Sequence, residues 1–218
     1  MSTKPPRTER LVWVGLGLTT ALLLLASWLA VLKVRAGFGK PLPVYGQVAD
    51  FQLTNQDGRP VTLAELRGQV WVADIIFTRC AGPCLKMSRQ MLDLQQGLPA
   101  GSAVKLISLT TDPDFDSPSI LKKYSERFSA NPKRWWFLTG TKAQIASLAI
   151  DSLKLTAIEK KAEERQSAAD LFVHSTIFVL VDKRGQLRGV YETNGEGTDP
   201  GQVRSQLLAG IRRLEHEG

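Results

Sequence analysis

Residues 70–84 read Val-Trp-Val-Ala-Asp-Ile-Ile-Phe-Thr-Arg-Cys-Ala-Gly-Pro-Cys, and this stretch decides the fold. Its first eight residues are apolar except for Asp74, which is typical of a strand with both faces covered. Pro83 is tolerated in the first turn of a helix, so a helix is predicted over 83–96. The two cysteines therefore lie between the carboxyl end of a central strand and the start of a helix, where sites in α/β sheets commonly occur.

The rest of the chain beyond residue 47 alternates between strand-like and helix-like segments. A turn signal over 55–58 predicts an N-terminal hairpin. Strands are predicted over 50–54, 60–63, 104–109, 136–138, 175–181 and 187–191, and helices over 117–128, 141–153 and 202–215. We interpret the polar, weakly patterned residues 154–170 as an insert. Strands that alternate with helices and end in a hairpin and a helix predict a three-layer α/β/α sandwich.

Residues 11–32 form a run of 22 residues without a charge. As a helix this run would be roughly 33 Å long, which is enough to cross the hydrocarbon core of a bilayer. We favour an uncleaved anchor over a signal peptide, because the run is long and Lys33 and Arg35 follow it instead of small residues. The predicted organisation is a tail over 1–10, a transmembrane anchor over 11–34, a linker over 35–46 and one domain over 47–218.

The net charge of +7 is concentrated near the N-terminus. Residues 1–35 contain five Lys or Arg residues and one acid, which leaves 23 basic and 20 acidic residues in the rest of the chain. Basic residues beside a membrane span favour anionic lipid, so membrane lipid is an expected partner. The sequence has no basic stripe with interleaved aromatic residues, and nucleic acid is therefore not an expected partner.

Cys80 and Cys84 are the only cysteines of the chain, and three residues separate them. Two cysteines are too few for a framework of structural disulfides. One helical turn apart, they can form a single disulfide or bind one soft metal ion together. The helix dipole and the neighbouring Arg79 favour the thiolate form of such a pair. Two thiolates alone suit Cu(I), whereas a structural zinc site would require four protein ligands.

The two histidines and a pair of methionines are the other candidates for soft-metal ligands. His174 precedes a predicted strand, and on position alone it is either a ligand or a structural or solvated histidine. We interpret His216, near the C-terminus, as solvated, and Met87 and Met91 as core residues. Two buried, inert cysteines remain the plain alternative to a site.

Three motifs resemble those of the Sco/SenC family of membrane-anchored copper-binding proteins, and they occur in the family's order. They are Asp74-Ile75-Ile76-Phe77-Thr78-Arg79-Cys80 with Cys84, Thr111-Asp112-Pro113 with Asp116-Ser117-Pro118, and His174-Ser175-Thr176 with Val181-Asp182 and Gly185. Together they cover most of residues 47–215. The resemblance implies a thioredoxin-like fold and a Cu(I) or Cu(II) site whose ligands are Cys80, Cys84 and His174.

The resemblance also implies a role and a location. The role is that of a metallochaperone that matures the copper A centre of cytochrome c oxidase, with the copper A subunit and a copper donor protein as partners. The location is the bacterial inner membrane, with one span and the domain facing the periplasm, or else the mitochondrial inner membrane facing the intermembrane space. The bacterial setting is favoured because no Arg-rich, Ser-rich transit segment precedes the span. Two residues depart from the family's pattern: Ala81 replaces a common proline, and Val173 an acidic residue that often precedes the histidine.

Three other functions would use the same cysteines. A thiol–disulfide oxidoreductase would use them as a redox-active pair, with Cys80 as the attacking thiolate. Such reductases usually have two residues between their cysteines and a cis-proline opposite them, whereas this chain has no proline between Pro132 and Pro200. A peroxidase would have threonine at the position of Phe77, and a redox or copper sensor acting through a partner is a third alternative. The sequence therefore leaves open whether the chain is an enzyme.

Overall fold

The structure, a computed structural model, describes residues 7–37, 41–80, 82–161, 163, 172–195 and 197–217. The chain divides into two compact units, Met1–Pro41 and Leu42–Gly218. In the first unit the chain forms helix α1 (Arg7–Gly37), whose large apolar side chains described between residues 13 and 29 are exposed. No helix within the described ranges is both long enough and apolar enough to cross a membrane, and the predicted anchor is unconfirmed.

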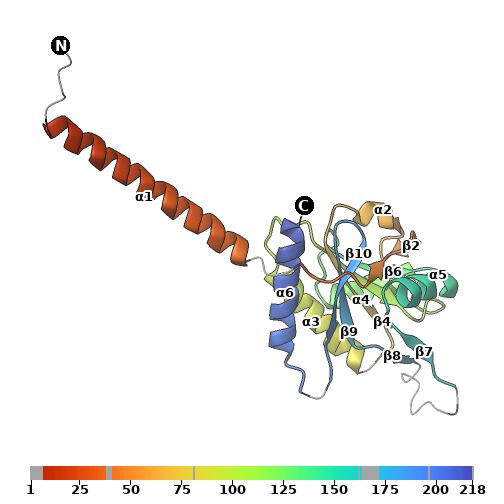
Figure 1. Cartoon of the computed structure of the whole chain (residues 1–218). Coiled ribbons are helices and arrows are strands. Elements are labelled where there is room, and N and C mark those ends of the chain that lie inside the picture. Colours follow the sequence, from red (N-terminus) through yellow and green to blue (C-terminus); the bar gives the residue numbers. More distant parts are fainter. Residues whose placement is uncertain are drawn as a thin grey trace. The chain divides into compact units, whose positions relative to one another are not determined.

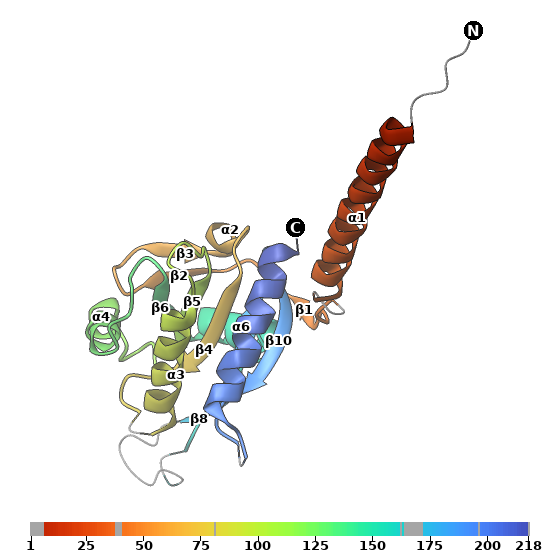
Figure 2. The same cartoon turned by 90° about the vertical axis from the view of Figure 1, so that its left-hand side faces the viewer.

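The second unit is built around one sheet of eight strands in the order β1-β10-β9-β4-β5-β6-β2-β3 (Figures 1 and 2). These strands are β1 (Gly46–Gln47), β2 (Gln52–Asn55), β3 (Pro60–Thr62), β4 (Trp71–Ile76), β5 (Lys105–Thr110), β6 (Trp135–Thr139), β9 (Ile177–Val181) and β10 (Gln186–Glu192). β4, β5 and β6 are parallel to one another, whereas β9 and β10 run antiparallel to their neighbours. β4 lies near the middle of the sheet and all six of its residues are buried, as the sequence predicts.

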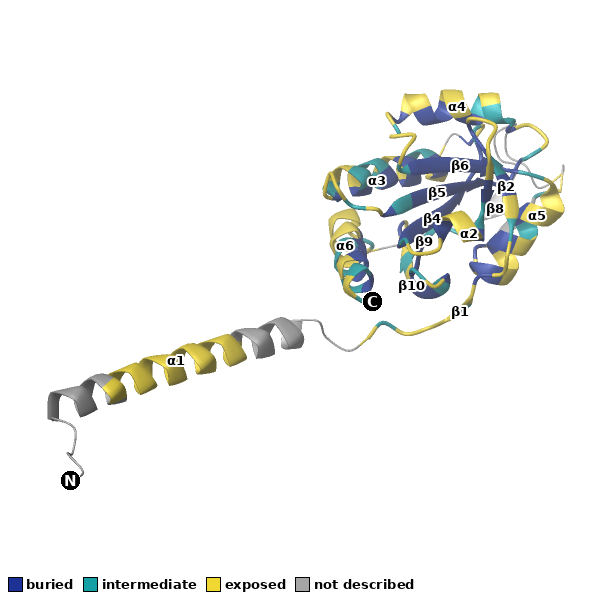
Figure 3. Ribbon diagram, turned by 90° about the horizontal axis from the view of Figure 1, so that it is seen from above, coloured by how far each residue is buried: buried dark blue, intermediate teal, exposed yellow. Residues whose placement is uncertain are grey.

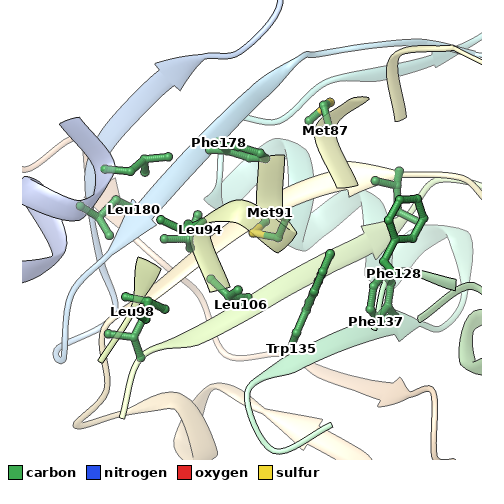
Figure 4. Close-up of a cluster of buried hydrophobic side chains, with 14 of the residues drawn as sticks. Met87, Met91, Leu94, Leu98, Leu106, Phe128, Trp135, Phe137, Phe178 and Leu180 are labelled. Carbon is green, nitrogen blue, oxygen red and sulfur yellow. The ribbon is translucent and has the colours of Figure 1, made fainter. Parts of the chain in front are cut away.

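Helices cover both faces of this sheet, as predicted (Figure 3). One face carries α3 (Pro83–Gly97), α4 (Pro118–Arg127) and α6 (Pro200–His216), and the other carries α2 (Leu63–Leu66), α5 (Lys142–Ala146) and the π-helical segment η1 (Ser147–Ser152). Met87 and Met91 are fully buried and share a cluster with Trp135 and Phe178 (Figure 4). Both methionines are therefore core residues, as the sequence predicts.

The structure differs from the predicted elements in four short segments. Helix α2, which the sequence did not predict, directly follows β3. The second half of the helix predicted over 141–153 is π-helical. The insert predicted over 154–170 contains β7 (Ala157–Glu159), which pairs antiparallel with β8 (Phe172–His174) in a separate sheet of two strands. β1 begins inside the predicted linker. Elements of two or three residues carry too little periodicity to be found from the sequence alone.

Candidate metal centre

The cysteine loop connects the carboxyl end of β4 to the start of α3. Cys80 is 6% exposed, and its backbone N–H donates to the carbonyl of Phe77 at 3.2 Å. Cys84 is completely buried in the first turn of α3, directly after Pro83 at the first helical position. The strand-to-helix junction predicted from the sequence is thus present, and it directs both thiols inward instead of toward solvent.

The two thiols are in contact, because the side chains of Cys84 and Cys80 are hydrogen-bonded to each other. This hydrogen bond, burial, and the charges of Cys80 and Asp74 raise the pKa of the Cys84 thiol, whereas the backbone of Phe77 lowers it. The prediction that the helix start and Arg79 favour the thiolate is therefore wrong for Cys84. Charge on a buried sulfur beside a second sulfur costs more than a helix terminus can offset.

A buried carboxylate holds the start of the cysteine loop. Asp116 is fully buried, and Oδ2 of Asp116 accepts a hydrogen bond from the backbone nitrogen of Thr78 at 3.1 Å. The hydroxyl of Thr78 donates to Oδ1 of the same carboxylate, and the hydroxyl of Thr110 donates to Oδ2 at 2.5 Å. The burial raises the pKa of Asp116, and the hydrogen bonds from Thr110 and Thr78 oppose that shift.

The next residue of the loop, Arg79, is held by the same segment. Nε and Nη2 of Arg79 donate to Oδ2 of Asp112 at 3.1 and 2.5 Å, and the guanidinium lies 4.2 Å from the ring centroid of Phe115. The Asp112 side chain is largely buried and that of Arg79 is partly exposed. The charge that the sequence places beside the cysteines is therefore paired with a carboxylate, which weakens its effect on them.

Residues 110–118 thus have a structural role that sequence reasoning did not assign. The sequence singled out Asp112 and Asp116 as members of a motif, but only the folded structure brings them to Thr78 and Arg79. The available signal was their position directly after β5, because β4 and β5 are parallel neighbours whose carboxyl ends meet at one edge of the sheet.

The structure describes only the backbone of His174. This residue ends β8 and is paired with Ala157, and its side chain lies outside the described residues. The β7–β8 sheet lies at the same end of the unit as the start of α3 (Figures 1 and 2). His216 ends α6. Within the described ranges, no group of three His, Cys, Asp or Glu side chains could hold a metal ion.

The two departures from the family's pattern lie at the edge of what the structure describes. Ala81 is outside the described residues, and for Val173 only the backbone pairing with Ile158 is described. The structure therefore brings Cys80 and Cys84 together, and two sulfur atoms in contact suit either a disulfide or a soft metal ion.

Comparisons with known proteins agree with this geometry. The family model described as SCO1/SenC matches residues 43–208. The SCO1 protein homolog of Bacillus subtilis is 38% identical over 160 residues, which cover 72% of this chain and 79% of that protein. A putative copper-binding protein of Stutzerimonas stutzeri is 28% identical over 150 residues, 68% of this chain and 70% of that protein.

A solved structure has the same fold. It is a structure of BsSco, described as a member of the Sco family of cytochrome c oxidase assembly proteins in which a disulfide switch was identified. It matches with a TM-score of 0.67 and 31% identity, and covers 82% of this chain and 100% of that one. The family match spans most of the folded unit and includes the cysteine loop, the Asp116 segment and β8. The chain therefore belongs to the SCO1/SenC family of thioredoxin-like proteins.

Proposed function

We propose that this protein is a metallochaperone that holds Cu(I) with Cys80, Cys84 and His174 and serves the maturation of the copper A centre of cytochrome c oxidase. The observation that carries the proposal is the buried pair of thiols in mutual contact at the β4–α3 junction. Further support comes from the copper-binding relative in Stutzerimonas stutzeri and from BsSco, a member of a family of oxidase assembly proteins.

The donor set fits a soft cargo ion. Thiolate sulfur binds Cu(I) well, and neutral imidazole is a suitable third ligand. Because the pKa of Cys84 is raised, this residue is a thiol in the metal-free protein, and loading must release its proton. A site with three protein ligands leaves a position at which a partner's thiolate can attack, so the ion can pass from one protein to the other by stepwise ligand exchange.

We propose further that the oxidation state of the cysteines gates copper binding. Thiol–disulfide exchange with a disulfide of a partner protein would close a Cys80–Cys84 disulfide: the partner's disulfide takes up the two electrons and two protons and becomes two thiols, and the ion loses both sulfur ligands. The contact between the two thiols supports this proposal, since little movement is needed to join them. The disulfide switch identified in BsSco supports it as well.

The proposed setting is the periplasmic face of a bacterial inner membrane, with the mitochondrial inner membrane as the alternative. Residues 11–34 are proposed as the anchor, 35–46 as the linker and 47–218 as the copper-binding domain. The support is the uncharged run of 22 residues over 11–32 and the exposed apolar side chains of α1. The proposed partners are membrane lipid, the oxidase's copper A subunit and a copper donor protein.

Metal stoichiometry tests the proposed function. The full chain, reduced without oxygen, should bind one Cu(I) per molecule. Cys80→Ser, Cys84→Ser and His174→Ala should each weaken binding strongly, whereas His216→Ala, the matched histidine control, should not. An equal affinity for Cu(I) in all four variants would contradict the proposal.

A thiol–disulfide oxidoreductase is the second candidate, and the unequal exposure of the two cysteine residues favours it. Cys80 retains some exposure and can attack, whereas Cys84 is fully buried and would resolve the mixed disulfide. Rapid reduction of protein disulfides by copper-free chain, abolished in Cys80→Ser, would favour this candidate over the chaperone.

A further inference from the structure

The turn that follows β10 contacts both the segment after His174 and α3, the helix that bears Cys84. Glu192, the last residue of β10, accepts hydrogen bonds at Oε1 from the hydroxyl of Thr176 at 2.6 Å and from the backbone nitrogens of Thr193 and Asn194 at 3.1 and 3.2 Å. Thr193 itself is completely buried. The carboxylate of Glu192 thus accepts hydrogen bonds from Thr176 and from two backbone nitrogens of the turn. The conformation of this turn is therefore well defined.

Thr193 contacts the segment that follows the histidine strand. Its backbone nitrogen and its hydroxyl both donate to the carbonyl of Thr176, at 2.7 and 2.5 Å. Thr176 is two residues after His174, the last residue of β8. Between them, the backbone nitrogen of Ser175 donates to the carbonyl of Thr156 at 2.8 Å. The two residues after His174 are thus hydrogen-bonded to two different segments, Ser175 to Thr156 and Thr176 to Thr193.

On its other side, the turn contacts the helix that bears Cys84. Nε2 of Gln90, on α3, donates to the carbonyl of Thr193 at 3.2 Å, and Nζ of Lys86 donates to Oδ1 of Asn194 at 2.6 Å. A continuous path of hydrogen bonds therefore runs from α3 through Thr193 to Thr176. We call Gln90, Thr193 and Thr176 the Thr193 bracket.

The oxygen of the Gln90 side-chain amide indicates that packing alone does not explain why a glutamine is at this position. Oε1 of Gln90 is buried and has no hydrogen-bond partner among the residues that the structure describes. Gln90 lines a cavity of about 330 Å³ between α3 and α6, together with the apolar side chains of Leu94, Phe178 and Leu207. An acceptor without a partner in such a place destabilises the fold. Leucine would avoid that cost but would leave the carbonyl of Thr193 without its donor, so the hydrogen bond to Thr193 is what glutamine provides here.

We propose that Gln90 and Thr193 are positioning residues, which fix the backbone of Thr176, and with it the strand that bears His174, against the helix that bears Cys84. The inference rests on the proposed function, since it concerns how the third ligand is presented to the cysteines. His174 ends a separate two-stranded sheet, three residues before β9 begins in the main sheet, where Ile177 pairs with Glu192. The Thr193 bracket extends this β10–β9 pairing by one residue toward His174 and ties it to α3.

Backbone amide exchange in the metal-free, reduced full chain tests this inference without copper. In Gln90→Leu and Thr193→Val we expect amides of residues 174–177 to exchange about fivefold faster, because each variant loses one hydrogen bond of the bracket. Thr193→Ser keeps the hydroxyl and should exchange like the wild type. Gln95→Leu is the matched control: Gln95 is on the same helix, and its Nε2 also donates to a backbone carbonyl, that of Ser129 at 3.3 Å.

Two further measurements separate positioning from general stability. Cu(I) release from the loaded full chain to excess bathocuproine disulfonate should be about fivefold faster in Gln90→Leu and Thr193→Val than in the wild type, Thr193→Ser and Gln95→Leu. The melting temperature of Gln90→Leu should stay close to that of the wild type, because the variant removes one unpaired acceptor, Oε1 of Gln90, and leaves another, the carbonyl of Thr193, without its donor. A general loss of stability would instead lower the melting temperature and accelerate exchange throughout the unit.

The outcomes distinguish this inference from the proposed function. Unchanged exchange at 174–177 in both variants overturns the inference, and so does faster exchange with unchanged copper release. A wild-type chain that binds no Cu(I) defeats the proposed function, and the exchange data then still decide whether the bracket holds this segment.

Discussion

Asp116 accepts hydrogen bonds from both the backbone nitrogen and the hydroxyl of Thr78, so one buried carboxylate fixes the residue two positions before Cys80. The two residues are 38 positions apart in the sequence. The contact joins the loop after β5 to the loop after β4 at the edge of the sheet where the cysteines lie. It is therefore part of the site's framework.

Removing this carboxylate should destabilise the folded unit. Asp116→Ala leaves the Thr78 nitrogen and the hydroxyl groups of Thr78 and Thr110 without their acceptor, and we expect a loss of about 2–4 kcal/mol in the free energy of unfolding. Denaturant titration of the full chain measures it. Asp114→Ala, two residues away with a side chain that is 73% exposed, is the control and should change stability by no more than about 0.5 kcal/mol. Equal effects of the two variants would contradict the role given to Asp116.

The pKa of Asp116 predicts a pH dependence with a definite sign. Burial raises this pKa, with a further contribution from the charge of Asp112. Between the unfolded pKa and the higher folded pKa, the folded state therefore binds more protons than the unfolded state. The contribution of Asp116 to stability is therefore present below its unfolded pKa of about 3.9 and is lost as the pH rises through its higher folded value. Asp116→Asn should remove that loss. Unfolding curves of both proteins between pH 3 and pH 7, roughly this window, measure the difference.

Long apolar segments made the centre of the fold predictable. The run over 70–77 has no alternative to a covered strand, and the helix over 83–96 has an apolar stripe that agrees with a proline at its start. β1, β7 and β8 are too short to show a period, so they were not predicted. β8 matters most among them, because it bears His174 and lies outside the main sheet.

The meeting of the two cysteines was predictable from the sequence, but the electrostatics around them were not. The spacing of Cys80 and Cys84 predicts two sulfurs close together, and the structure brings their side chains into contact, although Cys80 precedes α3 and is not in its first turn. The sequence also shows that Arg79 and a helix start are nearby, but it cannot show that Asp112 pairs with Arg79 or that Cys84 is fully buried. Both facts depend on tertiary packing. The hydrogen bond with Cys80 and the burial of Cys84 reverse the expected direction of the Cys84 pKa.

The Arg188 cluster should be a major source of stability at the edge of the sheet. Arg188 is buried, and its guanidinium donates to Asp182 and Glu217 at 2.7 Å each and to the carbonyl of Leu42 at 2.8 Å. Arg188→Ala leaves the buried carboxylate of Asp182 without its cation, and we expect a loss of about 3–5 kcal/mol in the free energy of unfolding. Arg67→Ala removes an ion pair whose side chains are 59% and 90% exposed, and it should have little effect. Denaturant titration of both variants provides the comparison.

The thiols of the metal-free, reduced protein should differ in their reaction with iodoacetamide. Alkylation requires a thiolate that the reagent can reach. Cys84 is fully buried and its pKa is raised, so at pH 8 it should remain unmodified while Cys80, which is 6% exposed, reacts slowly. Peptide mass spectrometry after timed quenching measures both sites. In denaturant the two cysteines should react at similar rates, which is the internal control. Alkylation of Cys84 ahead of Cys80 in the folded chain would contradict the buried thiol pair, and with it the observation that supports both the copper site and its closure as a disulfide.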